Sequence, residues 1–280
     1  MTLGTFFDCD SLGQALLPAV LEAGRLELAH MSSGVVIEQK ADNSPVTSAD
    51  REAEAIIVAS LARAMPNVPV VAEEAAADGR LPAPSQRFFL VDALDGTRLF
   101  IRGKPEFSIN IALIDNGRPV FGLIYAPAFA RLYMTKADRL SYVAALQPDA
   151  ADDVVSALPW QQLVSRAPDF DNLTAFNSPT ASGPSGELLK ALGVAAQRQL
   201  GSSLKFCHLA AGEGDLYVRL GNTFEWDTAA GQAILEAAGG TVTGVDGEAL
   251  TYGHASRGYL NPHFVAWGRQ PLFDRLATSA

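Results

Sequence analysis

An apolar run that ends in two carboxylates constrains this chain more than any other part of its sequence. The stretch FFLVDALDGTRLFI, residues 88–101, is typical of a buried strand, yet it places Asp92 and Asp95 three positions apart. Two carboxylates in a partly desolvated site cannot both stay ionised unless a proton or a cation separates them. Within the stretch the first basic residue is Arg98, so the pattern favours a bound cation.

Ligand chemistry narrows the choice of cation. A turn after a strand explains Asp95, because Asp-Gly is favoured in turns, but it does not explain Asp92. Ligand sets made only of oxygen suit hard ions, and Mg²⁺ is held by a few carboxylates together with waters and substrate phosphate. Further acids are expected where strands meet helices, which is where ligands collect in layered folds: Asp50, Glu73, Glu74 and Asp227.

The residues after Asp95 indicate phosphate chemistry. The segment DGTRLF can turn at Gly96 into a helix whose first N–H groups would accept a phosphate, and the Thr97 hydroxyl could orient a water. Enzymes that form an aspartyl-phosphate carry D-x-D-G-T, whereas this chain reads D-A-L-D-G-T. On an extended strand, positions i and i+3 face opposite sides, so this spacing argues against an aspartyl-phosphate unless the strand has ended by Leu94. We therefore expect hydrolysis by metal-activated water and no covalent aspartyl intermediate.

Periodicity predicts two differently built halves. Before residue 140 we expect a helix over 11–31, which Pro18 either kinks or begins as a regular helix, a helix capped by Ser48, and a hairpin whose turn is DNGR. After residue 160 strands and helices alternate, starting with the strand QQLVS at 161–165, which predicts α/β layers. We expect an N-terminal α+β subdomain over 1–150 with most metal ligands, and a C-terminal α/β subdomain over 151–280 with Asp227.

Composition limits the partners. The chain has 280 residues and a formal charge of −10, and it lacks a basic run interleaved with aromatics, so we expect a small ligand and no nucleic-acid polymer. Only two cysteines occur, Cys9 and Cys207, which fits a reducing compartment and predicts a cytoplasmic protein. No apolar stretch approaches the roughly 18 residues of a membrane span.

Four motifs resemble, in order and spacing, those of the inositol monophosphatase superfamily of Mg²⁺-dependent, lithium-sensitive phosphatases: DNSPVTSADREAE, AEE, VDALDGTRLFI and WDTAAGQAILEAAGG. Four further segments are most similar to the bacterial 3′(2′),5′-bisphosphate nucleotidases of that superfamily: EFSINIALIDNGRPVFGLIYAP, GSSLKFC, DLYVRLG and GYLNPHF. The resemblance implies a layered αβαβα sandwich. It also suggests a homodimer, a role in sulfur metabolism and a cytoplasmic enzyme that can associate peripherally with the inner membrane.

The resemblance also implies a metal site with two or three Mg²⁺ ions. Glu73, Asp92 and the backbone carbonyl of Leu94 would bind one ion. A second ion would be bound by Asp92, Asp95 and Asp227, so that Asp92 bridges the two. Glu73 would also touch the attacking water or a third, weaker ion. The family's usual Pro after the first Asp is Ala93 here, which leaves the ligands unchanged.

By the same resemblance, Asp50 and Thr97 would position and deprotonate the attacking water. Gly96 and Thr97 would bind the scissile phosphate through backbone N–H groups, and Asp227 would also contact the substrate.

Two basic residues indicate the substrate. Arg219 stands where inositol monophosphatases carry an acid for inositol hydroxyls, so it suits a second phosphate. Lys205, preceded by Ser202 and Ser203, would hold the ribose and 5′-phosphate of 3′-phosphoadenosine 5′-phosphate, which would be cut to AMP and phosphate. Taken alone, Lys205 and Arg219 could equally be exposed surface cations.

Two alternatives remain open at this point. One is an inositol monophosphatase, or a sugar phosphatase of the same superfamily, because the metal motifs are shared. The other is a non-catalytic, metal-dependent phosphate binder. The intact pair Asp50 and Thr97 argues against the binder, because a protein that only binds phosphate has no need to activate water.

Overall fold

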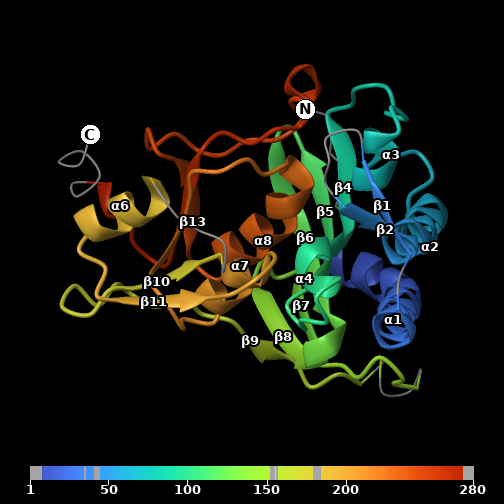
Figure 1. Ribbon diagram of the computed structural model, residues 1–280, viewed down its shortest axis with the longest axis horizontal. Coiled ribbons are helices and arrows are strands. Elements are labelled where there is room, and N and C mark those ends of the chain that lie inside the picture. The colour runs from blue at the N-terminus through green and yellow to red at the C-terminus, as the bar shows by residue number, and fades with distance from the viewer. Residues whose placement is uncertain are drawn as a thin grey trace.

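The computed structural model describes residues 8–34, 36–40, 45–151, 155, 157–178 and 184–273. Within this part of the chain the elements stack in five layers, seen from right to left in Figure 1. Helices α1 and α2 cover one face of a large sheet, α7 and α8 lie between that sheet and a small one, and α6 covers the outer face of the small sheet. The expected αβαβα sandwich is confirmed.

The outer helical layer follows the predicted period. Helix α1 spans Cys9–Ser33 with Pro18 inside it, and the side chain of Asp8 caps its start by accepting from the N–H of Asp10. Helix α2 spans Ser48–Ala64. Its N-cap is Thr47, so the expected Ser48 cap is wrong by one residue. The carboxylate of Asp50 fixes this start, because it accepts from both the N–H and the hydroxyl of Thr47.

The large sheet has the strand order β3-β4-β5-β6-β7-β8-β9. Its strands are β3 (Val70–Ala72), β4 (Arg87–Asp95), β5 (Ser108–Asp115), β6 (Arg118–Ala126), β7 (Arg131–Thr135), β8 (Ser141–Ala145) and β9 (Gln161–Gln162). Strands β3 and β4 are parallel and the other neighbours antiparallel. Asn116 and Gly117 both have positive φ, 50° and 75°, which confirms the predicted hairpin turn.

Burial on the large sheet alternates with period two. Phe89 and Val91 of β4 pack against α1 and α2, whereas Phe88 and Leu90 face the middle helices α7 (Leu204–Ala210) and α8 (Glu225–Ala237). Helix α8 lies close on β6 because Gly122 has no side chain. A Cβ at that position would come within 2.4 Å of the carbonyl oxygen of Ala230.

The small sheet has the order β11-β10-β12-β14-β13. Its strands are β10 (Thr174–Asn177), β11 (Ala196–Gln199), β12 (Leu216–Arg219), β13 (Thr241–Gly244) and β14 (Phe264–Trp267), with α6 (Pro184–Ala191) outside them. The strand expected at 161–165 belongs instead to the edge of the large sheet, where Gln161 and Gln162 pair with β8. The division into subdomains at residue 150 stays a prediction.

Shorter elements join these layers. A two-stranded hairpin of β1 (Ile37–Gln39) and β2 (Pro45–Thr47) precedes α2, and the single turns α3 (Glu73–Ala77) and α4 (Thr97–Phe100) follow β3 and β4. Two 3₁₀ turns, η1 (Pro127–Phe129) and η2 (Ala255–Arg257), also occur among the described residues. Among the described residues, no helix has an apolar stretch long enough to cross a bilayer.

Candidate active site

A β-bulge brings Asp92 and Asp95 to the same face of the large sheet. Asp92 lies opposite Asn110 of β5, and Asp95 lies opposite Ser108, so three steps on β4 match two steps on β5. Residues directly opposite each other on neighbouring strands point to the same face. The expectation that positions i and i+3 face opposite sides is therefore wrong here, because the bulge absorbs the extra residue. Spacing alone does not separate the two phosphatase chemistries.

Three acids from three elements converge beside this bulge. Glu73 begins α3, Asp92 lies on β4, and Asp227 is the third residue of α8. One carboxylate oxygen from each lies within 4.8 Å of the other two. Strand pairing explains part of the convergence, because β3 runs parallel to β4 and pairs Ala72 with Val91, the residues just before Glu73 and Asp92.

The electrostatics of this cluster favour a cation. Burial, followed by repulsion from the neighbouring carboxylates, raises the pKa of Asp92 and Asp227 well above the usual range. Burial also raises the pKa of Glu74 to about 7. Crowded carboxylate oxygens are the donor set that a hard divalent ion such as Mg²⁺ prefers. Glu73, Asp92 and Asp227 therefore fit a metal ion in chemistry and in spacing.

Asp95 lines the same cavity as these three acids, but its carboxylate is hydrogen-bonded to residues outside the cluster. One of its oxygens accepts from the N–H of Ser203, 2.5 Å away, and from the amide of Asn110, 3.3 Å away. Burial raises the pKa of Asp95, whereas the nearby Lys205 ammonium opposes that rise. The three-acid cluster described above does not include Asp95. In this structure it links the bulge to the start of α7.

Asp50 and Thr97, 47 positions apart in the sequence, are in contact. The Thr97 hydroxyl lies 2.9 Å from Asp50 Oδ1 and 3.2 Å from the carbonyl oxygen of Leu94, and it can donate to either. The other Asp50 oxygen accepts from Thr47, as described above. Burial raises the pKa of Asp50, while the Thr47 and Thr97 hydrogen bonds lower it. The predicted pair is thus brought together with the predicted carbonyl ligand.

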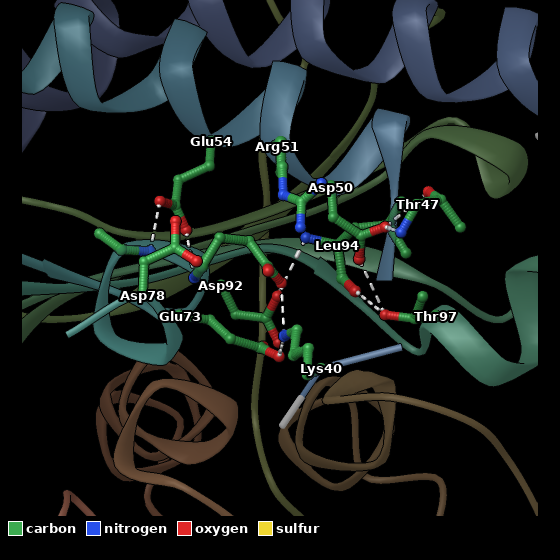
Figure 2. A network of polar contacts seen from close by, with 12 residues as sticks. Lys40, Thr47, Asp50, Arg51, Glu54, Glu73, Asp78, Asp92, Leu94 and Thr97 are labelled. Atoms are coloured by element: carbon green, nitrogen blue, oxygen red, sulfur yellow. Dashed lines mark hydrogen bonds and ion pairs between the residues drawn. The ribbon is translucent and has the colours of Figure 1, made fainter. Parts of the chain in front are cut away.

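Sequence reasoning missed two residues that hold Glu73 in place (Figure 2). Glu54 of α2 accepts from the N–H groups of Glu74 and Ala75, at 2.6 and 2.9 Å, and so satisfies the start of α3. Lys40 forms ion pairs of 2.5 Å with both Glu73 and Glu74. Glu54 could have been found from its spacing, because it lies one helical turn after Asp50 and so on the same face of α2.

A cavity of about 640 Å³ opens over these residues. Asp92, Asp95, Thr97 and Asp227 line it, as does Gly96, whose backbone has φ 103° and ψ 24°. A Cβ on Gly96 would also come within 2.8 Å of the carbonyl oxygen of Glu106. Both the backbone angle and the space require glycine, so the turn from β4 into α4 depends on it.

Four of the expected substrate residues line a smaller cavity of about 130 Å³, to which Asp95 and Asp227 also contribute: Ser202, Ser203, Lys205 and Arg219. Ser202 lines both cavities, and the Ser203 hydroxyl donates to Asn110 at 2.7 Å. Lys205 is only 3% exposed, so a surface role is wrong for it. Its ammonium donates to the carbonyls of Leu200 and Ser202, and burial lowers its pKa to about 8.

Arg219 is the last residue of β12, and it lines both cavities. Its guanidinium donates to the carbonyl of Asn222 at 2.9 Å and lies 3.4 Å from the Ser178 hydroxyl. The neighbouring Trp226 is 5% exposed and stacks on Phe224 with ring centroids 5.0 Å apart. It serves packing, as expected, and it supports the start of α8 that carries Asp227.

Comparisons with known proteins agree with this geometry. The model of the inositol monophosphatase family matches residues 8–275. The chain is 39% identical over 226 residues to the 3′(2′),5′-bisphosphate nucleotidase CysQ of Salmonella typhimurium, covering 81% of this chain and 86% of the relative. It is also 39% identical over 228 residues to the CysQ nucleotidase of Escherichia coli, covering 81% and 87%.

Solved structures give the same result. The crystal structure of CysQ from Bacteroides thetaiotaomicron, described as a bacterial member of the inositol monophosphatase family, superposes with a TM-score of 0.72 at 32% identity. The match covers 92% of this chain and 97% of that one. The resemblance inferred from the four motifs is confirmed.

Proposed function

The chain belongs to the inositol monophosphatase family, and from that premise we propose that it is a 3′(2′),5′-bisphosphate nucleotidase. It hydrolyses 3′-phosphoadenosine 5′-phosphate to AMP and inorganic phosphate. The observation that carries the assignment is the pair of curated relatives with that activity in their names, each 39% identical over 81% of the chain. Arg219 beside the cavity, where an acid would suit inositol hydroxyls, supports a phosphorylated nucleotide.

We assign Mg²⁺ as the cofactor, held by Glu73, Asp92 and Asp227, with the Leu94 carbonyl and Asp95 as further ligands. The crowding of the three carboxylate oxygens supports this assignment. When bound, Mg²⁺ supplies positive charge to the phosphate and activates the water nucleophile. Two or three ions are expected from the family.

Thr97 and Asp50 accept the proton that the attacking water releases. When the Thr97 hydroxyl donates to Asp50, its oxygen can still accept a hydrogen bond from the attacking water, because Thr97 lines the cavity. The water's proton then passes to Thr97, whose own proton moves to Asp50 Oδ1. Burial raises the pKa of Asp50, which makes it a stronger base. Gly96 and Thr97, which line the cavity, bind the scissile phosphate through their backbone N–H groups.

Location and assembly are part of the proposal. Both cysteines are free and buried, which supports a reducing, cytoplasmic compartment. A homodimer, peripheral association with the inner membrane, lithium sensitivity and a role in sulfur metabolism stay predictions from the family.

The test is phosphate release with Mg²⁺ from 3′-phosphoadenosine 5′-phosphate, inositol 1-phosphate and fructose 1,6-bisphosphate in parallel. We expect a strong preference for the nucleotide. Asp92→Asn should lower kcat/KM by at least about 100-fold, because loss of a metal ligand exceeds the effect of changing an outer partner. Mg²⁺ should raise the thermal midpoint of the unchanged protein and not that of Asp92→Asn.

Asp149→Asn, an exposed acid far along the chain, is the matched control and should leave both readouts unchanged. Preference for inositol 1-phosphate would keep the metal site and overturn the substrate. Absence of hydrolysis with all three compounds, while Mg²⁺ still stabilises the protein, would indicate a phosphate binder without catalysis.

A further inference from the structure

A buried acid lies two residues before Asp227 in the sequence. Glu225 is the first residue of α8, and its side chain is 0% exposed. The described residues that line the main cavity include Trp226 and Asp227 but not Glu225. Glu225 therefore does not act on a substrate in that cavity directly. Burying a carboxylate is costly unless hydrogen bonds satisfy it, so the partners of Glu225 indicate its role.

The hydrogen bonds that the Glu225 carboxylate accepts from the described part of the chain come from two successive residues. One oxygen accepts from the N–H of Gly253 at 2.6 Å. The other accepts from the N–H of His254 at 3.0 Å and from the Nδ1 of its ring at 2.8 Å. In the last pair Nδ1 is the donor, because an ionised carboxylate only accepts. Glu225 thus fastens the stretch at 253–254 to the start of α8.

The chain that follows His254 contacts the same helix start through its backbone and through a buried amide. The carbonyl of Tyr259 accepts from the N–H of Glu225 at 2.8 Å. The side-chain amide of Asn261 donates to the carbonyl of Phe224, the residue before α8, at 2.6 Å. The segment 253–261 therefore holds the first turn of α8 at both of its own ends.

The backbone of this segment is strained near its middle. Gly258 and Tyr259 both have positive φ, 62° and 60°. For a bulky residue such as Tyr259 this angle is a clear outlier, and such strain persists only where the surroundings impose it. The Tyr259 ring packs on Trp226, with centroids 5.9 Å apart, and Glu225 binds the start of the segment. Strain of this kind concentrates at functional sites.

The backbone held by this segment also sets the direction of the Asp227 carboxylate. One Asp227 oxygen accepts from the N–H of Phe224 at 2.8 Å, and the carbonyl of the same Phe224 accepts from Asn261. The Asp227 carboxylate therefore moves with the residues that the segment 253–261 holds. Because the three acids of the metal site must keep one oxygen each within 4.8 Å of the others, a displacement of this backbone would weaken the site.

We propose that Glu225 and His254 are positioning residues for the metal site. Their contact holds the segment 253–261 on the start of α8, and thereby holds Asp227 beside the other two acids. This inference deepens the proposed function and rests on its metal assignment. Replacing a residue that orients a metal ligand typically weakens metal binding by about 10- to 100-fold. Glu225 acts on Asp227 through the backbone, so the lower value is expected.

The test is a calorimetric titration of the metal-free protein with Mg²⁺, at one temperature for all variants. Glu225→Gln should raise the Mg²⁺ dissociation constant by about tenfold, and a higher Mg²⁺ concentration should restore most of the lost kcat. His254→Ala changes a side chain that is 35% exposed, so this second variant should fold normally. It should raise the dissociation constant by about threefold, because one of three hydrogen bonds is lost. His254→Asn keeps a donor in place of Nδ1 and should restore the constant.

Asp215→Asn is the matched control. Asp215 is also a buried carboxylate, and it accepts from Arg166 and from the N–H of Thr174, outside the lining of both cavities. Its replacement should lower the free energy of unfolding, measured with urea and a chelator, and leave the Mg²⁺ dissociation constant unchanged. A rise equal to that in Glu225→Gln would show that Mg²⁺ binding only follows stability, which would overturn the inference.

The other outcomes are equally distinct. An unchanged dissociation constant in Glu225→Gln or in His254→Ala would overturn the inference, as would a loss in His254→Ala that His254→Asn does not reverse. If the unchanged protein binds no Mg²⁺, the metal assignment fails and the inference fails with it. Mg²⁺ binding that follows the expected order of variants, without hydrolysis of the nucleotide, would support the inference and overturn only the proposed activity.

Discussion

A buried carboxyl in the first helix gives a stability prediction with a defined sign. Glu27 of α1 is 0% exposed, and among the described residues neither of its carboxylate oxygens has a hydrogen-bond partner. The titratable groups that act on it or are affected by it are Asp50 of α2 and Tyr125 of β6. Burial, with a smaller effect from Asp50, raises the pKa of Glu27 well above the usual range.

The sign follows from proton linkage. Above the ordinary carboxyl pKa the unfolded chain releases this proton, whereas the folded protein keeps it until the raised pKa is reached. The folded state then binds more protons, so the free energy of unfolding falls as pH rises through that window. One proton difference changes this free energy by about 1.4 kcal/mol per pH unit. This loss in the free energy of unfolding is absent below the ordinary carboxyl pKa, and it reaches its full value above the raised pKa of Glu27 in the folded protein.

The assay is urea unfolding of the unchanged protein and of Glu27→Gln from pH 5 to 8, in the presence of a chelator. Gln cannot ionise, so the stability of the variant relative to the unchanged protein should increase with pH by up to about 1.4 kcal/mol per pH unit, and should level off once the raised pKa of Glu27 is passed. The active-site acids are present in both proteins and cancel in the difference. Glu22→Gln, on the exposed side of α1, should run parallel to the unchanged protein.

Parallel curves for Glu27→Gln and the unchanged protein would refute the reasoning, because they would mean that Glu27 ionises as it does in water. Asp50 is close enough to couple to Glu27. Repeating the comparison in an Asp50→Asn background removes that coupling and should leave most of the slope.

Two further substitutions test the packing around the site. Gly122→Ala should lower the free energy of unfolding by about 1–3 kcal/mol, because the added methyl carbon would meet the Ala230 carbonyl oxygen at 2.4 Å. Gly186→Ala is the control: its methyl group would enter open space, so the variant should be neutral or slightly stabilised. Urea unfolding measures both variants. Asp215→Asn should lower the free energy of unfolding by about 3 kcal/mol, because the buried Asp215 carboxylate accepts two hydrogen bonds from Arg166. KM should not change. An unchanged urea midpoint would contradict this interpretation.

Local sequence chemistry predicted part of this molecule well. The turn at Asn116 and Gly117 was predictable because positive φ angles at two successive positions select those residues. The acids at element ends were predictable because Asp50 and Asp227 each accept from the backbone N–H three residues earlier, a bond set within one helical turn. Both features depend on neighbours in sequence, so the sequence alone contains them.

Features set by distant neighbours were not predictable. The bulge between Asp92 and Asp95 exists only through the register with β5, and no local signal distinguishes it from a straight strand. The strand at Gln161–Gln162 was assigned to the wrong layer because its partner, β8, lies on the large sheet. The alternative that Lys205 is an exposed surface cation could not be dismissed from the sequence, because its burial depends on β12 and on the loop before α7.

The three acids of the metal site are held by two different parts of the fold, the large sheet and α8. Glu73 and Asp92 are held together by adjacent parallel strands, so their spacing follows the large sheet. Asp227 comes from α8, whose distance from that sheet is set by the close contact at Gly122. A shift of α8 would therefore separate Asp227 from the other two acids while both sheets stay folded. Gly122→Ala should therefore weaken Mg²⁺ binding as well as lower the free energy of unfolding.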